Sequence, residues 1–260
     1  ELQKKSFERW KILKIFATEV FSKISLALPA NLETSNYLKK FGVKNVQIAG
    51  NLKFYGKQNI GNKISISIKK KFKNLKVWCA SSTHEGEEEL IFKIHKKLKK
   101  NQKKLITIII PRHINRISEI VNKVKINNLN YVIHSSKKKI KKNTDIYLVD
   151  AYGLTSSFFH LSNITFVGGS VIKHGGQNPL EPARQGNYVI SGPNIWNFVE
   201  IYEFLAKNNI STVTSDLSKI EKIINFKLNK KISKYSKSKI NNIGVDILNK
   251  NLLQIRKYLP

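Results

Sequence analysis

The chain has 260 residues, of which 41% are hydrophobic and 25% charged, so it can form one large or two modest domains. Lys and Arg together number 47 against 17 Asp and Glu, which gives a formal net charge of +30. A charge of this size attracts nucleic acids and anionic membranes alike, and its spread along the whole chain also fits a general bias toward Lys. Charge therefore rules out an acidic protein without selecting a partner.

Cysteine usage and hydropathy argue against a disulfide-bonded or membrane-spanning protein. The single Cys, Cys79, excludes an internal disulfide, and its apolar neighbours predict a buried thiol. No apolar run approaches the ~20 residues that span a bilayer, and the residues from Glu1 onward do not form a signal peptide. Because the sequence contains no Met and starts at Glu1, we expect a fragment of a longer protein.

The first fifty residues predict two features. Residues 7–21 mix large apolar side chains with Arg9, Lys11 and Lys14, so this segment either lies at an anionic interface or packs on its own domain. Residues 24–28, 32–41 and 46–48 have the patterns of a strand, a helix and a strand, with Gly42 ending the helix. They predict one βαβ unit.

From residue 77 to residue 206, apolar strands alternate with helices, which predicts a doubly wound parallel sheet. Such sheets bind ligands beyond the carboxyl ends of their strands, so Ser82, Arg112, Gly153, Gly169 and Asn178 are candidates by position. The predicted strands are 77–80, 105–110, 131–134, 146–149, 164–167 and 188–190. The predicted helices begin after Ser82 and cover 114–124, 153–161, 179–185, 198–206 and, at the end of the chain, 240–259.

The most informative stretch is 166–182, FVGGSVIKHGGQNPLEP, where a buried strand stops at paired glycines and a polar loop leads into a helix. Asn178 is a good N-cap, Pro179 suits the first helical position, and Glu181 follows three residues after the cap. A helix N-terminus delivered by a glycine loop suits a phosphate or carboxylate. The same pattern also occurs in loops without a ligand, where Glu181 would only complete a capping box.

Arg112 is the strongest charged candidate outside that loop. It follows the apolar strand and Pro111, so its guanidinium would reach the crevice and could clamp a phosphate or carboxylate in a bidentate way. Ser82, Thr83 and Lys53 are weaker candidates, since Ser82 could act only as a helix cap. The scattered histidines give no metal-binding spacing, and neither a P-loop nor a dinucleotide fingerprint is present.

Five motifs in order resemble the bacterial 3-deoxy-D-manno-octulosonic acid (Kdo) transferases, from about residue 6 to about residue 210. The central one is GGSxxxxGGxNPLEP, which begins at Gly168. The others are GNLKF at 50–54, ASSTHEGEE at 80–88, PRH at 111–113 and DAYG at 150–153.

This resemblance implies a GT-B glycosyltransferase, with two facing Rossmann-like domains and no metal or cofactor. Its reaction would move Kdo from CMP-Kdo to a lipid A precursor (lipid IVA), with inversion, at the cytoplasmic face of the bacterial inner membrane, an anionic surface. The residues that it implies in CMP binding are Pro111, Arg112, Tyr152, Gly153, Leu154, Asn178, Pro179, Leu180 and Glu181, with Lys53, Ser82 and Gly169 as weaker candidates. Glu181 would bind a ribose hydroxyl.

The resemblance also implies a domain division. Residues 1–50 would be the tail of an N-terminal acceptor domain, 51–236 the CMP-Kdo binding domain, and 237–260 a terminal helix that packs back toward the first. The general base is expected in the N-terminal domain, so no catalytic residue is predicted in this chain. Leu154 departs from the family, which usually has Glu there. The alternatives are another GT-B nucleotide-sugar transferase and, in a different class, a basic nucleic-acid-binding protein, although no nucleic-acid motif is present.

Overall fold

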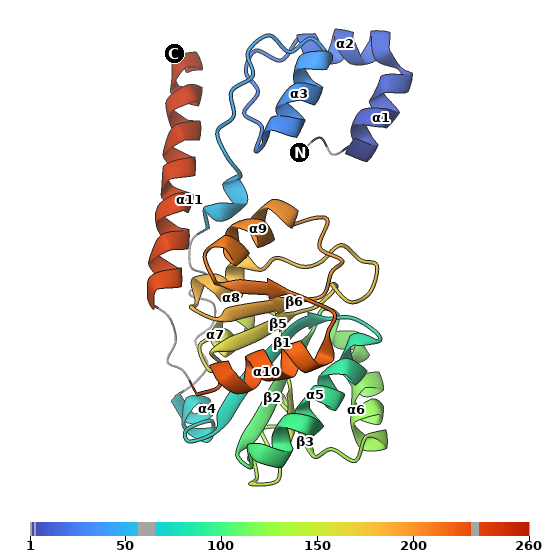
Figure 1. The fold of residues 1–260 in the computed structure, drawn as a ribbon, viewed down its shortest axis with the longest axis vertical. Coiled ribbons are helices and arrows are strands. Elements are labelled where there is room, and N and C mark those ends of the chain that lie inside the picture. Colours follow the sequence, from blue (N-terminus) through green and yellow to red (C-terminus); the bar gives the residue numbers. More distant parts are fainter. Residues whose placement is uncertain (1, 3, 57–65, 230–233, 260) are drawn as a thin grey trace. The chain divides into compact units, whose positions relative to one another are not determined.

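The computed structural model describes residues 2, 4–56, 66–229 and 234–259, and it divides into two compact units. One unit consists of residues 1–57 together with 239–260, and the other of residues 58–238 (Figure 1). The larger unit contains the parallel sheet and most of the motifs, so it is described first.

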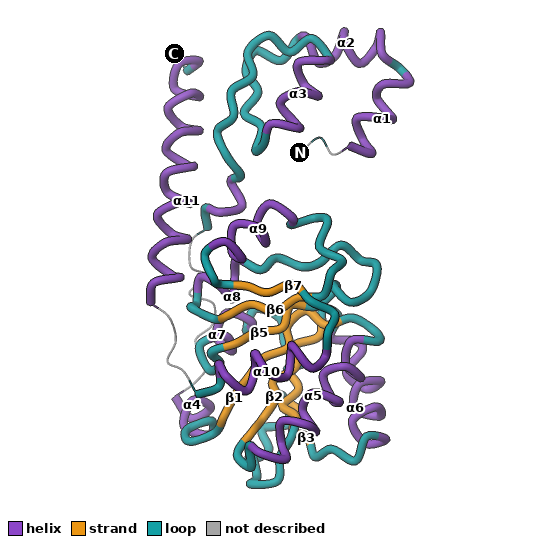
Figure 2. The backbone as a smooth tube through the Cα atoms, in the orientation of Figure 1, coloured by secondary structure: helices purple, strands orange, loops and turns teal. Residues whose placement is uncertain are grey.

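A seven-stranded sheet forms the centre of the larger unit (Figure 2). The strand order is β3-β4-β2-β1-β5-β6-β7, and every neighbouring pair is parallel. The strands are β1 (Lys76–Thr83), β2 (Leu105–Pro111), β3 (Tyr131–Ile133), β4 (Ile146–Leu148), β5 (Ile164–Val167), β6 (Tyr188–Ser191) and β7 (Ser211–Val213). This confirms the predicted doubly wound α/β fold.

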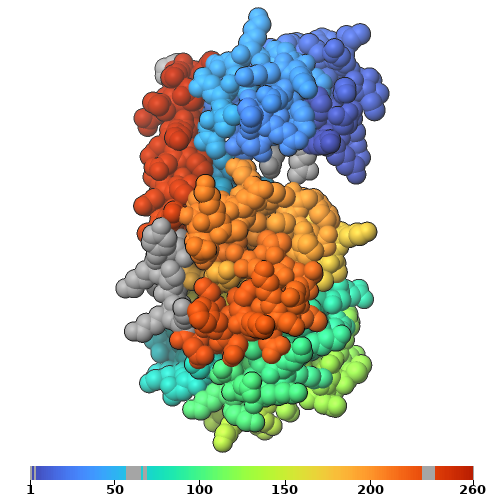
Figure 3. Space-filling view, in the orientation of Figure 1, coloured from blue at the N-terminus to red at the C-terminus, as the bar shows by residue number. Residues whose placement is uncertain are grey.

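Helices cover both faces of this sheet, because parallel strands are joined by crossover connections. The helices are α4 (Ile66–Lys71), α5 (Glu87–Asn101), α6 (Ile117–Ile126), α7 (Thr155–Phe159), α8 (Leu180–Arg184), α9 (Val199–Lys207) and α10 (Leu217–Lys227). In Figure 3, α10 lies beside α5 on the visible face. Lys97 of α5 and Glu221 of α10 form an ion pair at 3.6 Å.

The alternation of side chains along β1 divides the core into two layers. Trp78 and Ala80 pack with α5, α6 and α10, whereas Val77 and Cys79 pack on the other side with Phe158 of α7. All of these side chains are buried. The buried thiol predicted for Cys79 is confirmed, and burial raises its pKa.

Several predicted boundaries differ from the structure. The helix expected over 114–124 is a 3-10 turn (Ile114–Arg116) followed by α6, and the helix expected over 153–161 is the five-residue α7. The pair β7 and α10 was not predicted, because the short strand Ser211–Val213 has no apolar run and α10 falls in a Lys- and Asn-rich stretch. Only buried residues such as Ile220 and Ile224 mark α10 as part of the core.

The smaller unit contains α1 (Lys4–Ile12), α2 (Lys14–Ser22), α3 (Leu32–Lys40), a 3-10 turn at Leu52–Phe54, α11 (Lys234–Ile255) and a final 3-10 turn at Arg256–Tyr258. The helix of the predicted βαβ unit is present, but its two strands are reduced to a parallel bridge between Ala27 and Val46. Pro29 has no N–H to continue a ladder, so the extended segments pair only briefly. Among the helices of the described residues, none is long and apolar enough to cross a bilayer.

The helix α11 packs against the segment 50–55 of its own unit. Gly244 lies so close to this segment that an added Cβ would overlap the carbonyl of Phe54. Farther along the helix, Ile247 lies against Gly50. Tyr258, just beyond α11, hydrogen-bonds with Asn45.

Candidate functional site

The carboxyl ends of the parallel strands share one edge of the sheet, and the chain changes direction there between β1 and β5. From β1 the chain moves outward to β2, whereas from β5 it moves to β6 on the opposite side. Such a switch point opens a crevice at the strand ends, where ligands of α/β folds bind. The segments that follow β1, β2, β4 and β5 are therefore brought to one edge, as the sequence predicted.

The centre of this edge is occupied by the carboxylate of Glu87, the first residue of α5. Its side chain is fully buried. It accepts hydrogen bonds from the backbone N–H groups of Gly169 (2.7 Å), Ser170 (3.0 Å) and Val171 (3.0 Å), and from that of His84 (3.0 Å). Successive N–H groups of this kind form an anion-binding nest, and here the anion is part of the protein.

The nest gives Gly168 and Gly169 a structural role, where the sequence had suggested ligand binding. Gly169, a weaker candidate for ligand binding in the sequence, donates its N–H to Glu87. Gly168 is required by packing, because an added Cβ would lie 2.6 Å from a Glu87 oxygen and 2.8 Å from Thr83 Cα. The glycine pair therefore shapes the loop around a protein carboxylate.

Ser82 does not cap a helix, contrary to the sequence expectation. It lies within β1 at φ +55°, where the register with β2 shifts between Ser81 and Thr83. The N-cap of α5 is Gly86, at φ +89°. An apolar run followed by Ser-Ser-Thr looks like a strand and a cap, but the strand continues because Thr83 still pairs with Pro111.

A second buried carboxylate, Glu88, ties α5 to the segment after β2. Thr83 Oγ1 donates to it at 2.9 Å, and the Arg116 guanidinium donates to both of its oxygens at 2.9 and 3.2 Å. The same guanidinium also donates to Glu119. Neither Glu88 nor Arg116 was predicted to have this role.

Arg112 has a different environment from Arg116. Pro111 is the last residue of β2, and the Arg112 N–H donates to the Thr83 carbonyl at 3.0 Å, which fixes the backbone of this segment against β1. The Arg112 side chain is exposed, and within the described part of the chain its guanidinium makes no hydrogen bond or ion pair. This guanidinium is thus available to a ligand at the edge.

The candidates after β4 divide into open and packed positions. Tyr152 is 66% exposed, and Gly153, at φ +77°, has no neighbouring atom within 4 Å of the place where a Cβ would be. Leu154 precedes α7 and packs partly against the apolar layer that contains Phe158. The backbone around Gly153 is therefore accessible, whereas the Leu154 side chain is partly used in the core.

The helix after the glycine loop begins one residue later than the sequence predicted, at Leu180 and not at Pro179. The helix α8 has five residues, its N-cap is Pro179, and the Asn178 side chain accepts from the Leu180 N–H at 3.0 Å. Within the described residues, Glu181 makes no hydrogen bond back to Asn178, so the expected capping box is absent. Burial raises the pKa of Glu181, and the nearby Arg184 partly offsets this shift.

Three histidines that the sequence left without a role also lie at this edge. The ring of His84 lies 4.3 Å from that of His174 and 6.1 Å from that of His113, measured between centroids. These residues follow β1, β5 and β2, so only the sheet topology brings them together. No group of three His, Cys, Asp or Glu side chains suited to a metal ion occurs among the residues that the structure describes.

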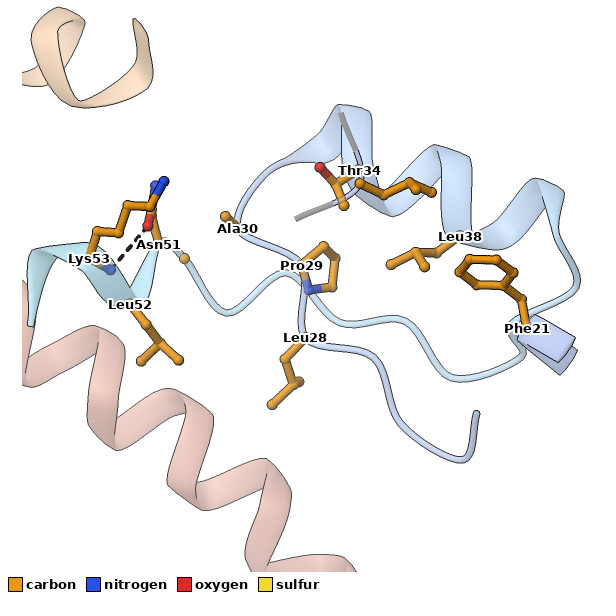
Figure 4. A pocket seen from close by; sticks show the side chains of 11 residues that line it. Phe21, Leu28, Pro29, Ala30, Thr34, Leu38, Asn51, Leu52 and Lys53 are labelled. Atoms are coloured by element: carbon orange, nitrogen blue, oxygen red, sulfur yellow. Dashed lines mark hydrogen bonds between the residues drawn. The ribbon is translucent and has the colours of Figure 1, made fainter. Parts of the chain in front are cut away.

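Lys53, the remaining candidate, belongs to the smaller unit. Its backbone N–H donates to the Asn51 side chain at 3.0 Å, and both residues line a cavity of about 570 Å³. Figure 4 shows the other walls of this cavity, which are mainly apolar and include Phe21, Leu28 and Leu38.

The parallel sheet with its switch point, together with its structural neighbours, defines the α/β fold of the GT-B class. The C-terminal CMP-Kdo binding domain of WaaA from Acinetobacter baumannii superposes with a TM-score of 0.57 at 26% identity, over 69% of this chain and 90% of that domain. TarM from S. aureus matches in fold alone, with a TM-score of 0.50 at 13% identity, over 90% of this chain and 44% of TarM.

Sequence comparison finds similarity to one family. Residues 1–55 match the family described as 3-deoxy-D-manno-octulosonic-acid transferase (kdotransferase). The 3-deoxy-D-manno-octulosonic acid transferase of Haemophilus influenzae is 31% identical over 99% of this chain and 61% of its own length, and that of Rickettsia prowazekii is 30% identical over 100% and 58%. The chain is similar to the Kdo transferases along its whole length, and it spans about three fifths of the length of these curated relatives.

Proposed function

We propose that this chain carries the donor-binding part of an enzyme that transfers Kdo from CMP-Kdo to a lipid A precursor (lipid IVA) in lipopolysaccharide biosynthesis. The observation that carries the proposal is the convergence of Arg112, the open backbone at Gly153 and the Asn178–Glu181 segment on the edge next to the switch point. The match over 90% of a CMP-Kdo binding domain supports it.

In this proposal each group has a separate task. The Arg112 guanidinium binds the phosphate of CMP, for which a planar fork of donors is suited. The backbone around Gly153, with Pro111 and Tyr152 beside it, receives the cytosine or ribose. Glu181, which is partly buried and not used as a cap, accepts hydrogen bonds from ribose hydroxyls.

The transfer is a displacement at the anomeric carbon of Kdo. An acceptor hydroxyl oxygen forms the new bond while the bond from that carbon to the phosphate oxygen breaks, and the electron pair leaves with CMP. Arg112 stabilises the negative charge that accumulates on the phosphate. The acceptor proton goes to a general base on the opposite face, which we expect outside these 260 residues, and we place the reaction at the cytoplasmic face of the inner membrane.

The distribution of lysines bears on the nucleic-acid alternative. Exposed lysines occur on helices from both units and on the 137–142 loop, for example Lys39 of α3, Lys96 of α5, Lys207 of α9 and Lys222 of α10. A nucleic-acid-binding surface instead gathers basic residues in one patch or stripe. The scatter therefore supports the glycosyltransferase proposal.

Calorimetric titration of the chain with CMP, UMP and AMP tests the donor assignment. We expect CMP to bind most tightly. Equal or absent binding of all three nucleotides would contradict the assignment of CMP-Kdo as the donor. The variant Arg112→Ala should weaken CMP binding by roughly tenfold or more, because a charge-assisted hydrogen bond is lost. The matched control is Arg256→Ala, which removes an exposed guanidinium from the smaller unit and should leave CMP affinity unchanged.

A further inference from the structure

The imidazole of His84 is buried at the carboxyl edge of the sheet, and only one of its two ring nitrogens forms a hydrogen bond. The side chain is 9% exposed. Its Nδ1 lies 3.0 Å from the Ser82 carbonyl oxygen, an acceptor that requires Nδ1 to carry the proton. Its Nε2 is buried and, within the described residues, has no hydrogen-bond partner.

A buried nitrogen without a partner is costly, and native structures usually retain one for a reason. A structural histidine would satisfy both nitrogens, as His95 does with Thr107 and Asp145. His84 instead has a fixed tautomer, in which the Nε2 of the neutral ring can take up a proton. The ring is held in place by the strained backbone of Ser82, at φ +55°.

Charged and titratable groups face His84 from three segments. Glu87, the first residue of α5, has an oxygen 3.9 Å from Nδ1 and favours a protonated ring. His174, from the β5 loop, and His113, from the β2 loop, oppose it. Burial lowers the pKa of His84 and His174 lowers it further, which together outweigh Glu87, so the surroundings favour the neutral ring.

We propose that His84 binds the phosphate of the nucleotide sugar through Nε2–H, and that the ring takes up a proton when the donor binds. This inference rests on the proposed function, because it deepens the same donor site. The phosphodiester supplies the negative charge that a protonated ring needs, and Glu87 supplies a second one on the opposite side. The exposed ring of His174 lies beside the His84 ring, 4.3 Å away between centroids.

Protonated His84 would also assist the departure of CMP. As the bond between the anomeric carbon and the phosphate oxygen breaks, the electron pair remains on that phosphate. The Nε2–H group donates to the phosphate and stabilises its second negative charge, without any change in oxidation state. A hydrogen bond of this kind is stronger in the transition state than in the ground state, so it accelerates transfer.

Proton uptake on binding is measurable by calorimetry in two buffers of different ionisation enthalpy. The probe is the methyl phosphodiester of CMP, because its phosphate does not titrate near neutral pH, whereas that of CMP does. At about pH 7 we expect wild type to take up between a few tenths and one proton per site. Cytidine, which has no phosphate, should bind without proton uptake.

The variant His84→Gln keeps a side-chain amide but cannot be protonated. We expect it to bind cytidine as wild type does, to bind the phosphodiester about tenfold more weakly, and to take up no proton. His160→Gln, at the end of α7, is the matched control and should keep the uptake. If His84→Gln does not fold, His174→Gln takes its place: without His174 the pKa of free His84 is lowered less, so proton uptake on binding should fall, and uptake equal to that of wild type would overturn the role of His84.

The outcomes separate this inference from the proposed function. If neither cytidine nor the phosphodiester binds, the donor assignment fails and His84 loses its role with it. If the phosphodiester binds to wild type without proton uptake, or if His84→Gln retains the uptake, the donor assignment survives and the role of His84 is overturned.

Discussion

Glu87 and Glu88 are adjacent in sequence and fully buried, yet their carboxylates stabilise different parts of the site. Glu87 accepts N–H groups from the loop after β5, whereas Glu88 binds Thr83 and the Arg116 side chain. Consecutive residues in the first turn of a helix point in different directions, so α5 can serve both loops. An acidic helix start thus acts through specific hydrogen bonds as well as through the helix dipole.

The variant Glu87→Gln should destabilise the protein by about 3 kcal/mol, because an amide NH₂ group would then face backbone N–H donors in a buried site. Urea unfolding followed by circular dichroism measures this loss. Glu85→Gln is the control, since Glu85 is exposed, and it should change stability by less than ~0.5 kcal/mol. Similar midpoints for the two variants would contradict the role assigned to Glu87.

The variant Glu181→Gln should harm nucleotide binding more than stability. The structure shows no capping box at Glu181, so little helix stability depends on its charge. Loss of an ionic acceptor for ribose hydroxyls should weaken CMP binding by roughly tenfold. A fall in melting temperature with unchanged CMP affinity would show that Glu181 is only structural.

Asp145, at the amino end of β4, makes the stability of the fold depend on pH. Burial alone would raise its pKa, but hydrogen bonds from His95 and the Asn130 N–H and the charge of Lys99 hold it well below its usual range. A carboxyl whose pKa is depressed by folding adds stability above its unfolded pKa of about 3.9 and loses it as pH falls.

Wild type should therefore lose more unfolding free energy between about pH 5 and pH 2 than Asp145→Asn, while being the more stable at neutral pH. Denaturant titrations at a series of pH values test this. Asp216→Asn is the comparison, because Asp216 caps α10 in an exposed position and its change should be small. Parallel pH profiles for wild type and Asp145→Asn would contradict the assignment.

In α11, a Gly→Ala substitution tests whether side-chain packing outweighs intrinsic helix propensity. Gly→Ala in an exposed helix interior stabilises by about 1 kcal/mol. Gly244→Ala should instead destabilise the smaller unit, because its Cβ would meet the Phe54 carbonyl. Limited proteolysis of α11 measures the effect, with the exposed Val245→Ala as control. Greater resistance of Gly244→Ala to the protease would show that this packing is absent.

The elements also show which features the sequence could predict. β2 is an uninterrupted apolar run and was predicted to within one residue, because burial on both faces leaves no alternation to interpret. The candidate edge followed from this pattern, since parallel strands end together. The histidine cluster and the Glu87 nest could not be predicted, because their members are up to 90 residues apart and only the strand order brings them together.

At the scale of the whole molecule, the larger unit has its own sheet and core, so we expect a fragment of residues 66–229 to fold alone. Its CMP affinity should be within about threefold of that of the 260-residue chain, because all candidates except Lys53 lie in it. Calorimetry on both proteins tests this expectation. A complete loss of CMP binding by a folded fragment would assign part of the donor site to the smaller unit.

We also expect the 260-residue chain to bind the donor without transferring Kdo. Transfer requires a base for the acceptor proton, and every group that we place on the donor edge serves the leaving side. A transfer assay with lipid A precursor should show no turnover, with the Haemophilus influenzae relative as positive control. Comparable turnover by both proteins would require a base within this chain.

The buried carboxylate at the centre of the edge has a consequence for the energetics of donor exchange. Ordering a loop on binding costs conformational entropy of about 1–2 kcal/mol per residue. Because Glu87, a group of the protein itself, holds the 169–171 backbone, the entropic cost of ordering this segment is paid during folding. We therefore expect the nest to keep its shape when a nucleotide binds and leaves, so that each binding event begins from the same preorganised surface.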